Sequence, residues 1–301
     1  MTELVGTVLE RDGAVYRVAT EAGVVRAVLT GRAKRGLPRV VVGDRVHLEP
    51  DPSGALQSIV GIETRTTLLE RRVPEGRGSR PVAANIDQVF VVTAAADPPP
   101  IPQLIDRLLV VAEANEIPAS VVVNKVDLAP AEVLTERCRR AGYTVHRTSV
   151  RTGEGIDALS AALAGRISVV TGPSGAGKST LLNRVQPGLR LRIGEISAKG
   201  RRGKNTTVSA VMVPLDGGGY LVDTPGFSEV GLWGIDPKQL DSCFPDFRPY
   251  LGECKYDDCR HRSEPGCRIH AAIAEGAIAA DRLVSYLVLL EELETAPEEW
   301  E

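Results

Sequence analysis

The sequence lacks a long hydrophobic run, an excess of either charge and a dense set of cysteines. No apolar stretch approaches the ~20 residues that span a bilayer, and the first residues turn polar too early for a signal peptide. We therefore expect a cytoplasmic protein with no membrane partner. The net charge of −3 excludes a uniformly basic protein that coats nucleic acid, although it permits local basic patches. In a reducing compartment, five cysteines favour free thiols or a metal site over disulfides.

The chain is long enough for more than one domain. Its 301 residues correspond to roughly two domains at ~150 residues each, and three small domains are possible. Apolar residues make up 43% and charged residues 25% of the chain. These values are typical of soluble globular proteins, so disordered and fibrous classes are excluded.

Residues 1–62 contain short apolar or alternating segments separated by turns with glycine and proline. Five such segments in so short a stretch predict a small closed barrel of the OB or SH3-like kind. A plain adaptor barrel without a ligand remains an alternative. The polar segment 63–84 carries five arginines against three glutamates and predicts a basic linker, with an arm that contacts phosphates as the alternative.

Residues 85–230 alternate between buried-strand and helical patterns. This alternation predicts a mainly parallel sheet with helices on both faces. From residue 231 the pattern changes to a cluster of cysteine and histidine followed by a helical run up to the C-terminus.

A phosphate-binding motif stands between a strand and a helix in the second region. The sequence G-P-S-G-A-G-K-S at 172–179 fits G-x-x-x-x-G-K-[ST], in which backbone N–H groups and a helix N-terminus surround phosphates. Lys178 is expected to bridge the β- and γ-phosphates, and Ser179 to bind Mg²⁺. The expected nucleotide contacts are Gly172, Pro173, Ser174, Gly175, Ala176, Gly177, Lys178, Ser179 and Thr180.

The tetrapeptide Asp223-Thr-Pro-Gly226 follows another predicted strand. In a P-loop fold this position faces Mg²⁺, so we expect Asp223 to hold the ion and the Gly226 N–H to contact the γ-phosphate. Without the P-loop, a simple β-turn would explain it equally well. Phe227 stands where many GTPases have a glutamine that orients the attacking water, which predicts slow intrinsic hydrolysis.

A guanine-reading motif, Asn124-Lys125-Val126-Asp127, follows a third predicted strand. A carboxylate at Asp127 pairs with the N1–H and exocyclic amine of guanine, and adenine would leave it unpaired. Asn124 is expected to tie loops together, and the stem of Lys125 to pack on the purine. Ser149 and Val150 fit the further loop whose backbone N–H meets guanine O6. An ATPase or kinase with an accidental N-K-V-D remains an alternative.

These motifs occur in an unusual order. Ordinary GTPases place the P-loop first, whereas here the guanine motifs at 124 and 148 precede the P-loop at 172, and D-T-P-G at 223 comes last. Joining the ends would restore the usual order, so we predict a circularly permuted GTPase domain whose loops still meet at the carboxyl edge of the sheet.

The segment 194–207 lies where the first switch of a GTPase belongs and is rich in glycine and basic residues. Thr206 or Thr207 is the candidate to close on Mg²⁺ and the γ-phosphate. Contact with RNA phosphates and a solvated basic loop are both compatible with this charge.

Three cysteines and one histidine form the pattern C-x4-C-x-H-x5-C near the C-terminus. Three thiolates and one imidazole suit a tetrahedral structural zinc with no open position. The predicted ligands are Cys254, Cys259, His261 and Cys267. Cys138 and Cys243 are assigned to packing, and His270 is not expected to be a ligand.

The barrel, the permuted motifs and the cysteine–histidine pattern together resemble the RsgA family, the ribosome small-subunit-dependent GTPases, over essentially the whole chain. The resemblance implies an OB-fold domain over 1–62, a linker over 63–84, a permuted GTPase domain over 85–230 and a mostly helical zinc-binding domain over 231–301. It also implies GTP or GDP, Mg²⁺ and one Zn²⁺ as bound groups. The implied activity is GTP hydrolysis on the small ribosomal subunit, with its rRNA, late in assembly.

One position departs from the family pattern. Family switch loops have a histidine proposed to act in hydrolysis near the site where this chain has Asn205, which cannot act as a base near neutral pH. Together with Phe227, this position leaves open an alternative function, an RNA-binding scaffold that binds GDP or GTP with little hydrolysis. The preferred interpretation is an enzyme, and we expect it to be a monomer.

Overall fold

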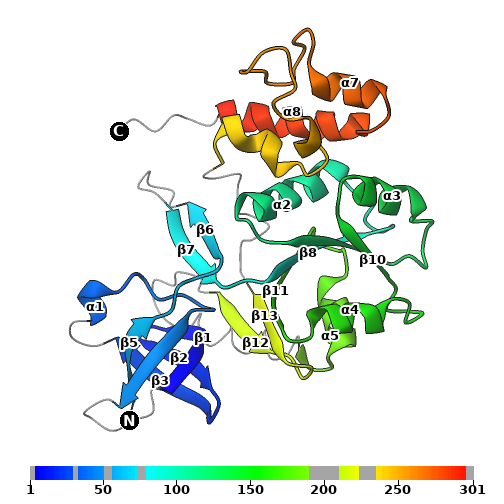
Figure 1. Cartoon of the computed structure of the whole chain (residues 1–301). Helices are drawn as coiled ribbons and strands as arrows, with labels where there is room; N and C mark the ends of the chain where they lie inside the picture. Colours follow the sequence, from blue (N-terminus) through cyan, green and yellow to red (C-terminus); the bar gives the residue numbers. More distant parts are fainter. Residues whose placement is uncertain are drawn as a thin grey trace.

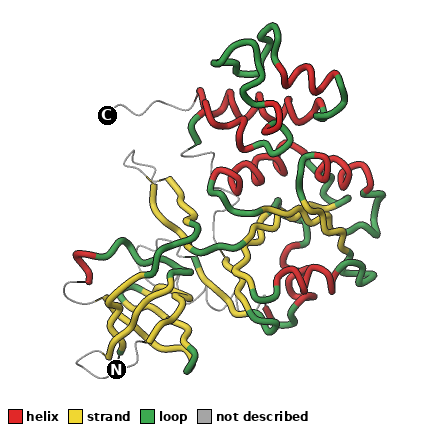
Figure 2. The backbone as a smooth tube through the Cα atoms, viewed as in Figure 1, coloured by secondary structure: helices red, strands yellow, loops and turns green. Residues whose placement is uncertain are grey.

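A computed structural model of the chain describes residues 4–29, 33–50, 56–72, 79–189, 210–223 and 235–295. Figure 1 shows a β-barrel at one end, a sheet covered by helices in the middle and a helical module at the other end. Figure 2 shows that the barrel is built of strands, whereas the helices gather around the sheet and in the helical module. No helix in the described part is both long and apolar enough to cross a membrane.

The barrel contains the five strands that the sequence predicts. They are β1 (Leu4–Asp12), β2 (Val15–Thr20), β3 (Gly23–Leu29), β4 (Arg45–Pro50) and β5 (Gln57–Ile62), and a short helix α1 (Ala33–Gly36) precedes β4. The strands close in the order β1-β2-β3-β5-β4. Alternate side chains such as Val8, Val18 and Leu48 point inward and are almost completely buried. The predicted closed barrel is confirmed.

The segment 63–84, predicted as a linker, instead contains an antiparallel hairpin of β6 (Leu68–Arg72) and β7 (Ser79–Ala84). The apolar residues Leu69 and Ala83 are each 1% exposed and join the main core of the protein. Their burial gives the hairpin a hydrophobic face, which a linker would lack. In the sequence, the short apolar pairs that form this face stand among many charged residues, and the segment was therefore predicted to be a linker.

The start of this segment is also bound to the barrel. Arg65 donates from Nε to Oδ1 of Asp44 at 2.7 Å and from Nη2 to Oδ2 at 2.9 Å, and the Asp44 side chain is fully buried. Asn85 accepts a hydrogen bond from the backbone N–H of Thr66 and donates one to the carbonyl of Gly43. Arg65 therefore fixes the barrel to the start of the hairpin segment. The side chains of Arg71, Arg72, Arg77 and Arg80 lie outside the described part, so an arm that contacts phosphates stays a prediction for them.

The central sheet has six strands in the order β10-β9-β8-β11-β13-β12. These are β8 (Gln88–Ala94), β9 (Ala119–Asn124), β10 (Thr144–Thr148), β11 (Arg166–Thr171), β12 (Val211–Pro214) and β13 (Gly219–Asp223). All neighbours are parallel except β12 and β13, so the predicted mainly parallel sheet is confirmed. Every residue of β8 is buried, which explains its continuous apolar sequence.

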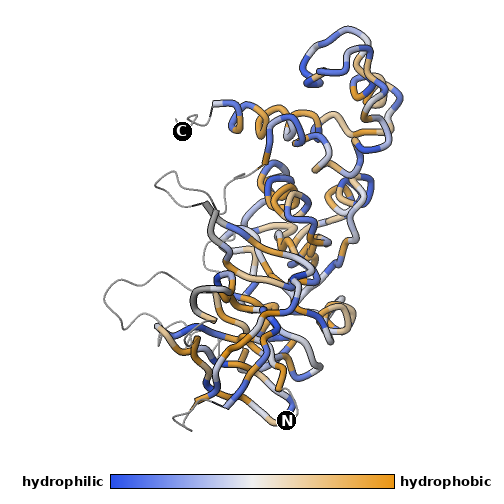
Figure 3. The backbone as a smooth tube through the Cα atoms, turned by 60° about the vertical axis from the view of Figure 1, so that its left-hand side comes forward, coloured by the Kyte–Doolittle hydropathy of each residue, from blue (hydrophilic) through white to orange (hydrophobic). Residues whose placement is uncertain are grey.

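Helices cover both faces of this sheet, and β8 supplies side chains to both layers. Val89 and Val91 pack with α2 (Pro102–Ala114) and α3 (Glu132–Arg140) on one face. Phe90 and Val92 pack with α4 (Ile156–Leu163) and α5 (Lys178–Val185) on the other. Figure 3 shows hydrophobic residues alternating with hydrophilic ones along the strands and the helices. Because the strands that precede helices run parallel, the loops that lead from these strands into the helices lie together at the carboxyl edge of the sheet.

The helical module follows the sheet and packs on α2. It comprises η2 (Pro237–Cys243), η3 (Arg248–Tyr250), α7 (Arg268–Ala274) and α8 (Ala280–Thr295). Its centre is aromatic: the rings of Phe244 and Phe247 stack at 5.0 Å, and Tyr286 lies 5.5 Å from Phe247. These side chains belong to the same buried cluster as the α2 face of the sheet, so the module and the sheet share one core.

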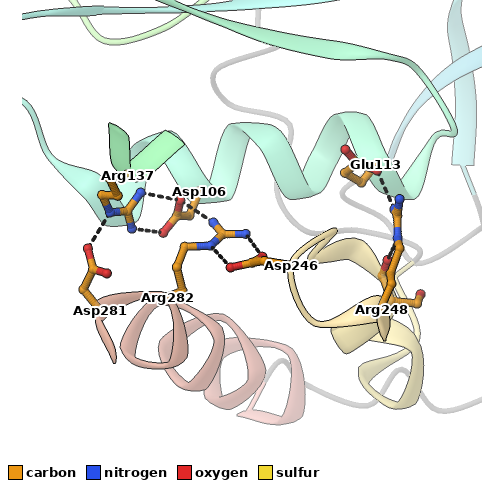
Figure 4. Close-up of polar contacts among 8 residues, drawn as sticks. Asp106, Glu113, Arg137, Asp246, Arg248, Asp281 and Arg282 are labelled. Atoms are coloured by element: carbon orange, nitrogen blue, oxygen red, sulfur yellow. Dashed lines mark hydrogen bonds and ion pairs between the residues drawn. The ribbon is translucent and has the colours of Figure 1, made fainter. Parts of the chain in front are cut away.

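A buried group of charges joins the module to the sheet layer (Figure 4). Asp106 of α2 is fully buried and accepts hydrogen bonds from Arg137 of α3 at 2.6 and 3.0 Å and from Arg282 of α8 at 2.6 Å. Arg282 also pairs with Asp246 at 2.8 Å, and Arg137 pairs with Asp281. Burial would raise the pKa of Asp106, but the two arginines outweigh it and hold the pKa below its ordinary value.

Candidate nucleotide site and metal centre

The phosphate-binding motif forms the turn between β11 and α5 and is built on glycine. Gly172 has φ = 136°, and a Cβ there would lie 2.0 Å from the carbonyl oxygen of Val92. Gly177 has φ = 88°, and a Cβ there would lie 2.5 Å from Nδ2 of Asn124. A side chain at either position would therefore collide with a neighbouring strand of the sheet, and the glycines keep the backbone close enough for its N–H groups to face a ligand.

Lys178 begins α5 and turns its ammonium group back over the loop. Its Nζ donates to the carbonyl oxygens of Gly172 at 2.5 Å and Pro173 at 2.8 Å. Burial lowers the pKa of Lys178, because an ammonium group partly removed from water loses solvation. A phosphate group at this loop would supply the negative charge that this cation favours.

Asn124, the last residue of β9, connects three loops. Its Nδ2 donates to the carbonyl oxygen of Ala176 in the P-loop at 3.0 Å, and its Oδ1 accepts from the Thr148 hydroxyl at 3.1 Å. Asn124 is 2% exposed, so both hydrogen bonds are shielded from water. The structure thus brings together motifs that lie far apart in the sequence.

The carboxylate of Asp127 is held by the loop that follows β10. The Ser149 hydroxyl donates to Oδ1 at 2.5 Å, and Nε of Arg151 lies 3.2 Å from Oδ2. The hydrogen bond from Ser149 is the main cause of the lowered pKa of Asp127, with the charge of Arg151 adding to it. Asp127 is therefore ionised at neutral pH and can accept two hydrogen bonds from a base edge. Val150, the other predicted residue of this loop, packs against the helix layer of α4 and α5.

A further loop at this site was missed in the sequence. Lys125 donates from Nζ to the carbonyl oxygen of Asp97, and Pro98 lies beside the P-loop, where a Cβ on Gly175 would be 3.1 Å from its Cδ. This loop follows β8, whose neighbours in the sheet are β9 and β11. The signal was available: a buried strand followed by A-D-P-P-P must end at the same carboxyl edge as the other two loops.

The remaining nucleotide residues lie at the same edge. Asp223 ends β13, which pairs with β11 in parallel, and Ser179 is in the first turn of the helix after β11. The P-loop residues Ser174, Gly175, Ser179 and Thr180 are exposed and accessible to a ligand. The predicted switch and turn residues Asn205, Thr206, Thr207, Gly226 and Phe227 lie outside the described residues.

The four predicted metal ligands converge in the helical module. Nδ1 of His261 lies 3.7 Å from Sγ of Cys254, 3.6 Å from Sγ of Cys259 and 3.4 Å from Sγ of Cys267, and the four ligand atoms all lie within 4.8 Å of one another. Zn–S and Zn–N bonds of about 2.3 and about 2.0–2.1 Å at tetrahedral angles place sulfur and nitrogen about 3.6 Å apart. Both the donor set and the spacing therefore fit zinc.

Neighbouring groups orient these ligands. Nε2 of His261 lies 3.3 Å from Oδ2 of Asp241, so a carboxylate holds the ring with Nδ1 toward the cysteines. The backbone N–H of Arg268 donates to Sγ of Cys254 at 3.3 Å. Burial raises the pKa of Cys259 to about 12, and a bound cation would stabilise thiolates here. Asp241 was missed in the sequence because it lies outside the cysteine–histidine spacing.

The other predicted cysteines and histidine have separate roles. Cys138 and Cys243 are buried, and burial raises the pKa of each thiol to about 11, as expected for packing residues. Nε2 of His270 lies 3.2 and 3.0 Å from the carbonyl oxygens of His261 and Arg262, where it supports the loop that carries the ligand histidine.

Comparisons with known proteins agree with this geometry. Residues 62–233, more than half of the chain, match the family described as RsgA GTPase. The chain belongs to the RsgA GTPase family. A "Small ribosomal subunit biogenesis GTPase RsgA" from Gemmatimonas aurantiaca is 46% identical over 301 residues, covering 97% of this chain and 98% of the relative. The protein of the same description from Moorella thermoacetica is 42% identical over 290 residues, with coverages of 96% and 97%.

Solved structures show the same fold. YjeQ from Thermotoga maritima has a TM-score of 0.80 and 32% identity, covering 98% of this chain and 100% of that chain. YloQ, described as a circularly permuted GTPase, has a TM-score of 0.78 at 23% identity, covering 99% and 97%, and supports the fold alone. The predicted RsgA membership, the three-part fold and the assignment as a GTP hydrolase are confirmed.

Proposed function

We propose that this protein binds the small ribosomal subunit and hydrolyses GTP to GDP and phosphate late in the assembly of that subunit, with the subunit stimulating hydrolysis. The observation that supports the nucleotide part of the proposal is the hydrogen bond from Nδ2 of Asn124 to the carbonyl oxygen of Ala176, which joins the predicted guanine motif to the P-loop. Both relatives described above carry the words "small ribosomal subunit biogenesis" in their names, which supports the biological process.

The site is suited to a guanine nucleotide. Asp127, ionised and fixed by Ser149, would accept the two N–H donors of guanine, and Lys178 would bind the phosphates. Ser179 and Asp223 would hold Mg²⁺, which when bound neutralises charge on the phosphates. Thr206 or Thr207 would complete this metal site in the GTP-bound protein.

One Zn²⁺ per chain would be held by the three cysteines and His261 in a structural role. Four protein ligands leave no coordination position for a substrate. The ion would hold the loop 252–267 against α8, through the ring contacts of His261 with Phe247 and Tyr286.

The RNA partner would be the rRNA of the small subunit, bound by basic residues concentrated in part of a chain whose net charge is −3. Residues 189–204 carry six basic residues against one acidic residue. The protein would act as a cytoplasmic monomer.

The test is GTP turnover with and without purified small ribosomal subunits, with large subunits as the control. Strong stimulation by small subunits alone, lost in Lys178→Ala, is the expected result. GTP binding without turnover under any condition would instead favour the scaffold alternative, and competition by ATP at concentrations equal to GTP would favour an ATPase.

A further inference from the structure

Arg151 occupies the carboxylate that is expected to read guanine. Its Nε lies 3.2 Å from Oδ2 of Asp127, whereas Oδ1 accepts the Ser149 hydroxyl. The Asp127 side chain is 9% exposed and the Arg151 side chain 76% exposed. The arginine therefore reaches from solvent to a carboxylate that is almost covered.

Guanine and the guanidinium group of Arg151 offer Asp127 similar hydrogen-bond donors. Guanine presents a planar edge with an N1–H and an exocyclic N2 amine, and a guanidinium presents planar N–H donors of the same kind. Both edges can satisfy a carboxylate through N–H···O contacts, and in the structure the guanidinium approaches Oδ2 through Nε. Since Ser149 already binds one oxygen, the oxygen taken by Arg151 is one that a two-donor base edge requires.

We propose that Arg151 is an internal surrogate for guanine: it holds Asp127 in the nucleotide-free protein, must leave it when the base binds, and so weakens the binding of GDP and GTP. This inference rests on the proposed binding of guanine nucleotides. Replacing Arg151 by the base on Asp127 costs little free energy, because the exposed guanidinium is then hydrated by water.

The backbone around Arg151 is fixed, so the side chain can move without the loop. The Ser149 N–H donates to the carbonyl oxygen of Glu154 at 3.0 Å, and the Gly153 N–H donates to the carbonyl oxygen of Ser149 at 2.9 Å. The Thr152 N–H donates to the Ser149 hydroxyl at 3.1 Å. Ser149 thus keeps its place on Asp127 while Arg151 exchanges with the base.

The expected effect is modest, because exposed ion pairs contribute little. Removing the surrogate by Arg151→Met should tighten GDP binding between about 1.5-fold and about fivefold. Arg151→Lys keeps a cation near Asp127 and should lie between the wild type and Arg151→Met. Arg45→Met is the matched control, because it removes an exposed arginine paired with Glu63 in the barrel.

Binding of inosine diphosphate distinguishes competition between Arg151 and guanine for Asp127 from a general effect of the substitution on the loop. Its base has the N1–H but no exocyclic amine, so one oxygen of Asp127 stays available to Arg151, and Arg151→Met should leave its affinity unchanged. The tightening for GDP should also shrink as salt rises from about 0.1 M to about 1 M, because screening weakens the competing pair in the wild type.

The experiment is a titration of nucleotide-free full-length protein with fluorescent GDP, competed by unlabelled GDP and inosine diphosphate, on the wild type and the three variants. A thermal melt of each variant verifies folding. Weaker or unchanged GDP binding in Arg151→Met, or equal tightening for both nucleotides, would overturn the proposal. Absence of guanine-nucleotide binding by the wild type would instead overturn the proposed function.

Discussion

The side-chain amide of Asn124 donates to the carbonyl oxygen of Ala176 at 3.0 Å, across 52 residues of sequence. This hydrogen bond makes the guanine motif and the phosphate loop into one unit, although the permutation places them in reversed order along the chain. The geometry of the base site therefore depends on the phosphate site.

Replacing Asn124 tests this dependence. Asn124→Ala leaves a buried acceptor at Ala176 and a buried hydroxyl at Thr148 without their partner, at a cost of about 1–3 kcal/mol. We expect GDP affinity to fall by on the order of tenfold or more, measured by fluorescence titration. Asn115→Ala is the matched control, because that amide binds only its own helix at Val111. Equal losses in the two variants would contradict a specific role for Asn124.

Asp127 offers a test of base specificity. Asp127→Asn replaces one acceptor by an N–H₂ donor, which opposes the donors of guanine but matches the 2-carbonyl of xanthine. We expect GDP binding to weaken and binding of xanthosine diphosphate to appear, in competition titrations of the two nucleotides. If the variant binds GDP as the wild type does, Asp127 does not read the base.

Asp241 tests the metal centre through a residue that is not a ligand. Asp241→Asn weakens the acceptor for Nε2 of His261, and outer partners of this kind are worth about 10–100-fold in metal affinity. We expect the wild type to contain one zinc per chain by elemental analysis, and the variant to lose it to a chelator at lower concentration. Asp258→Asn, which changes an exposed acid in the loop that carries the metal ligands, should behave as the wild type. Folded protein without metal would refute the zinc site itself.

Asp106 makes the free energy of unfolding depend on pH in the acid range. Its pKa is lowered in the folded protein, so its contribution is complete above the ordinary carboxyl pKa of about 4 and is lost as pH falls toward the folded value. We expect the free energy of urea unfolding to fall between about pH 5 and about pH 3 more steeply in the wild type than in Asp106→Asn.

The same substitution should be costly at neutral pH. It leaves Arg137 and Arg282 without their shared carboxylate, which typically costs about 3–5 kcal/mol. Glu21→Gln removes an exposed carboxylate for comparison and should change neither the stability nor its slope. A neutral effect of Asp106→Asn would mean that the buried charges are not coupled as the distances indicate.

The features that the sequence predicted carry local signatures. The barrel strands have a period of two, and the P-loop has glycines at fixed spacing before a helix. The missed features depend on contacts between distant segments. Asp106 meets Arg282 across 176 residues, and His261 meets Asp241 across 20 residues without a motif of their own. The β6–β7 hairpin was missed for a related reason, since Leu69 stands among charged residues and only the core that it joins identifies it as a buried residue.

The strand order has a mechanical consequence. The P-loop strand β11 lies between β8, which the chain enters from the barrel and hairpin, and β13, after which the chain continues to the helical module. Both flanking modules are thus attached to the two hydrogen-bonded neighbours of β11. A large particle that contacts the barrel and the helical module at the same time would therefore act on the two strands that flank the strand carrying the phosphate loop.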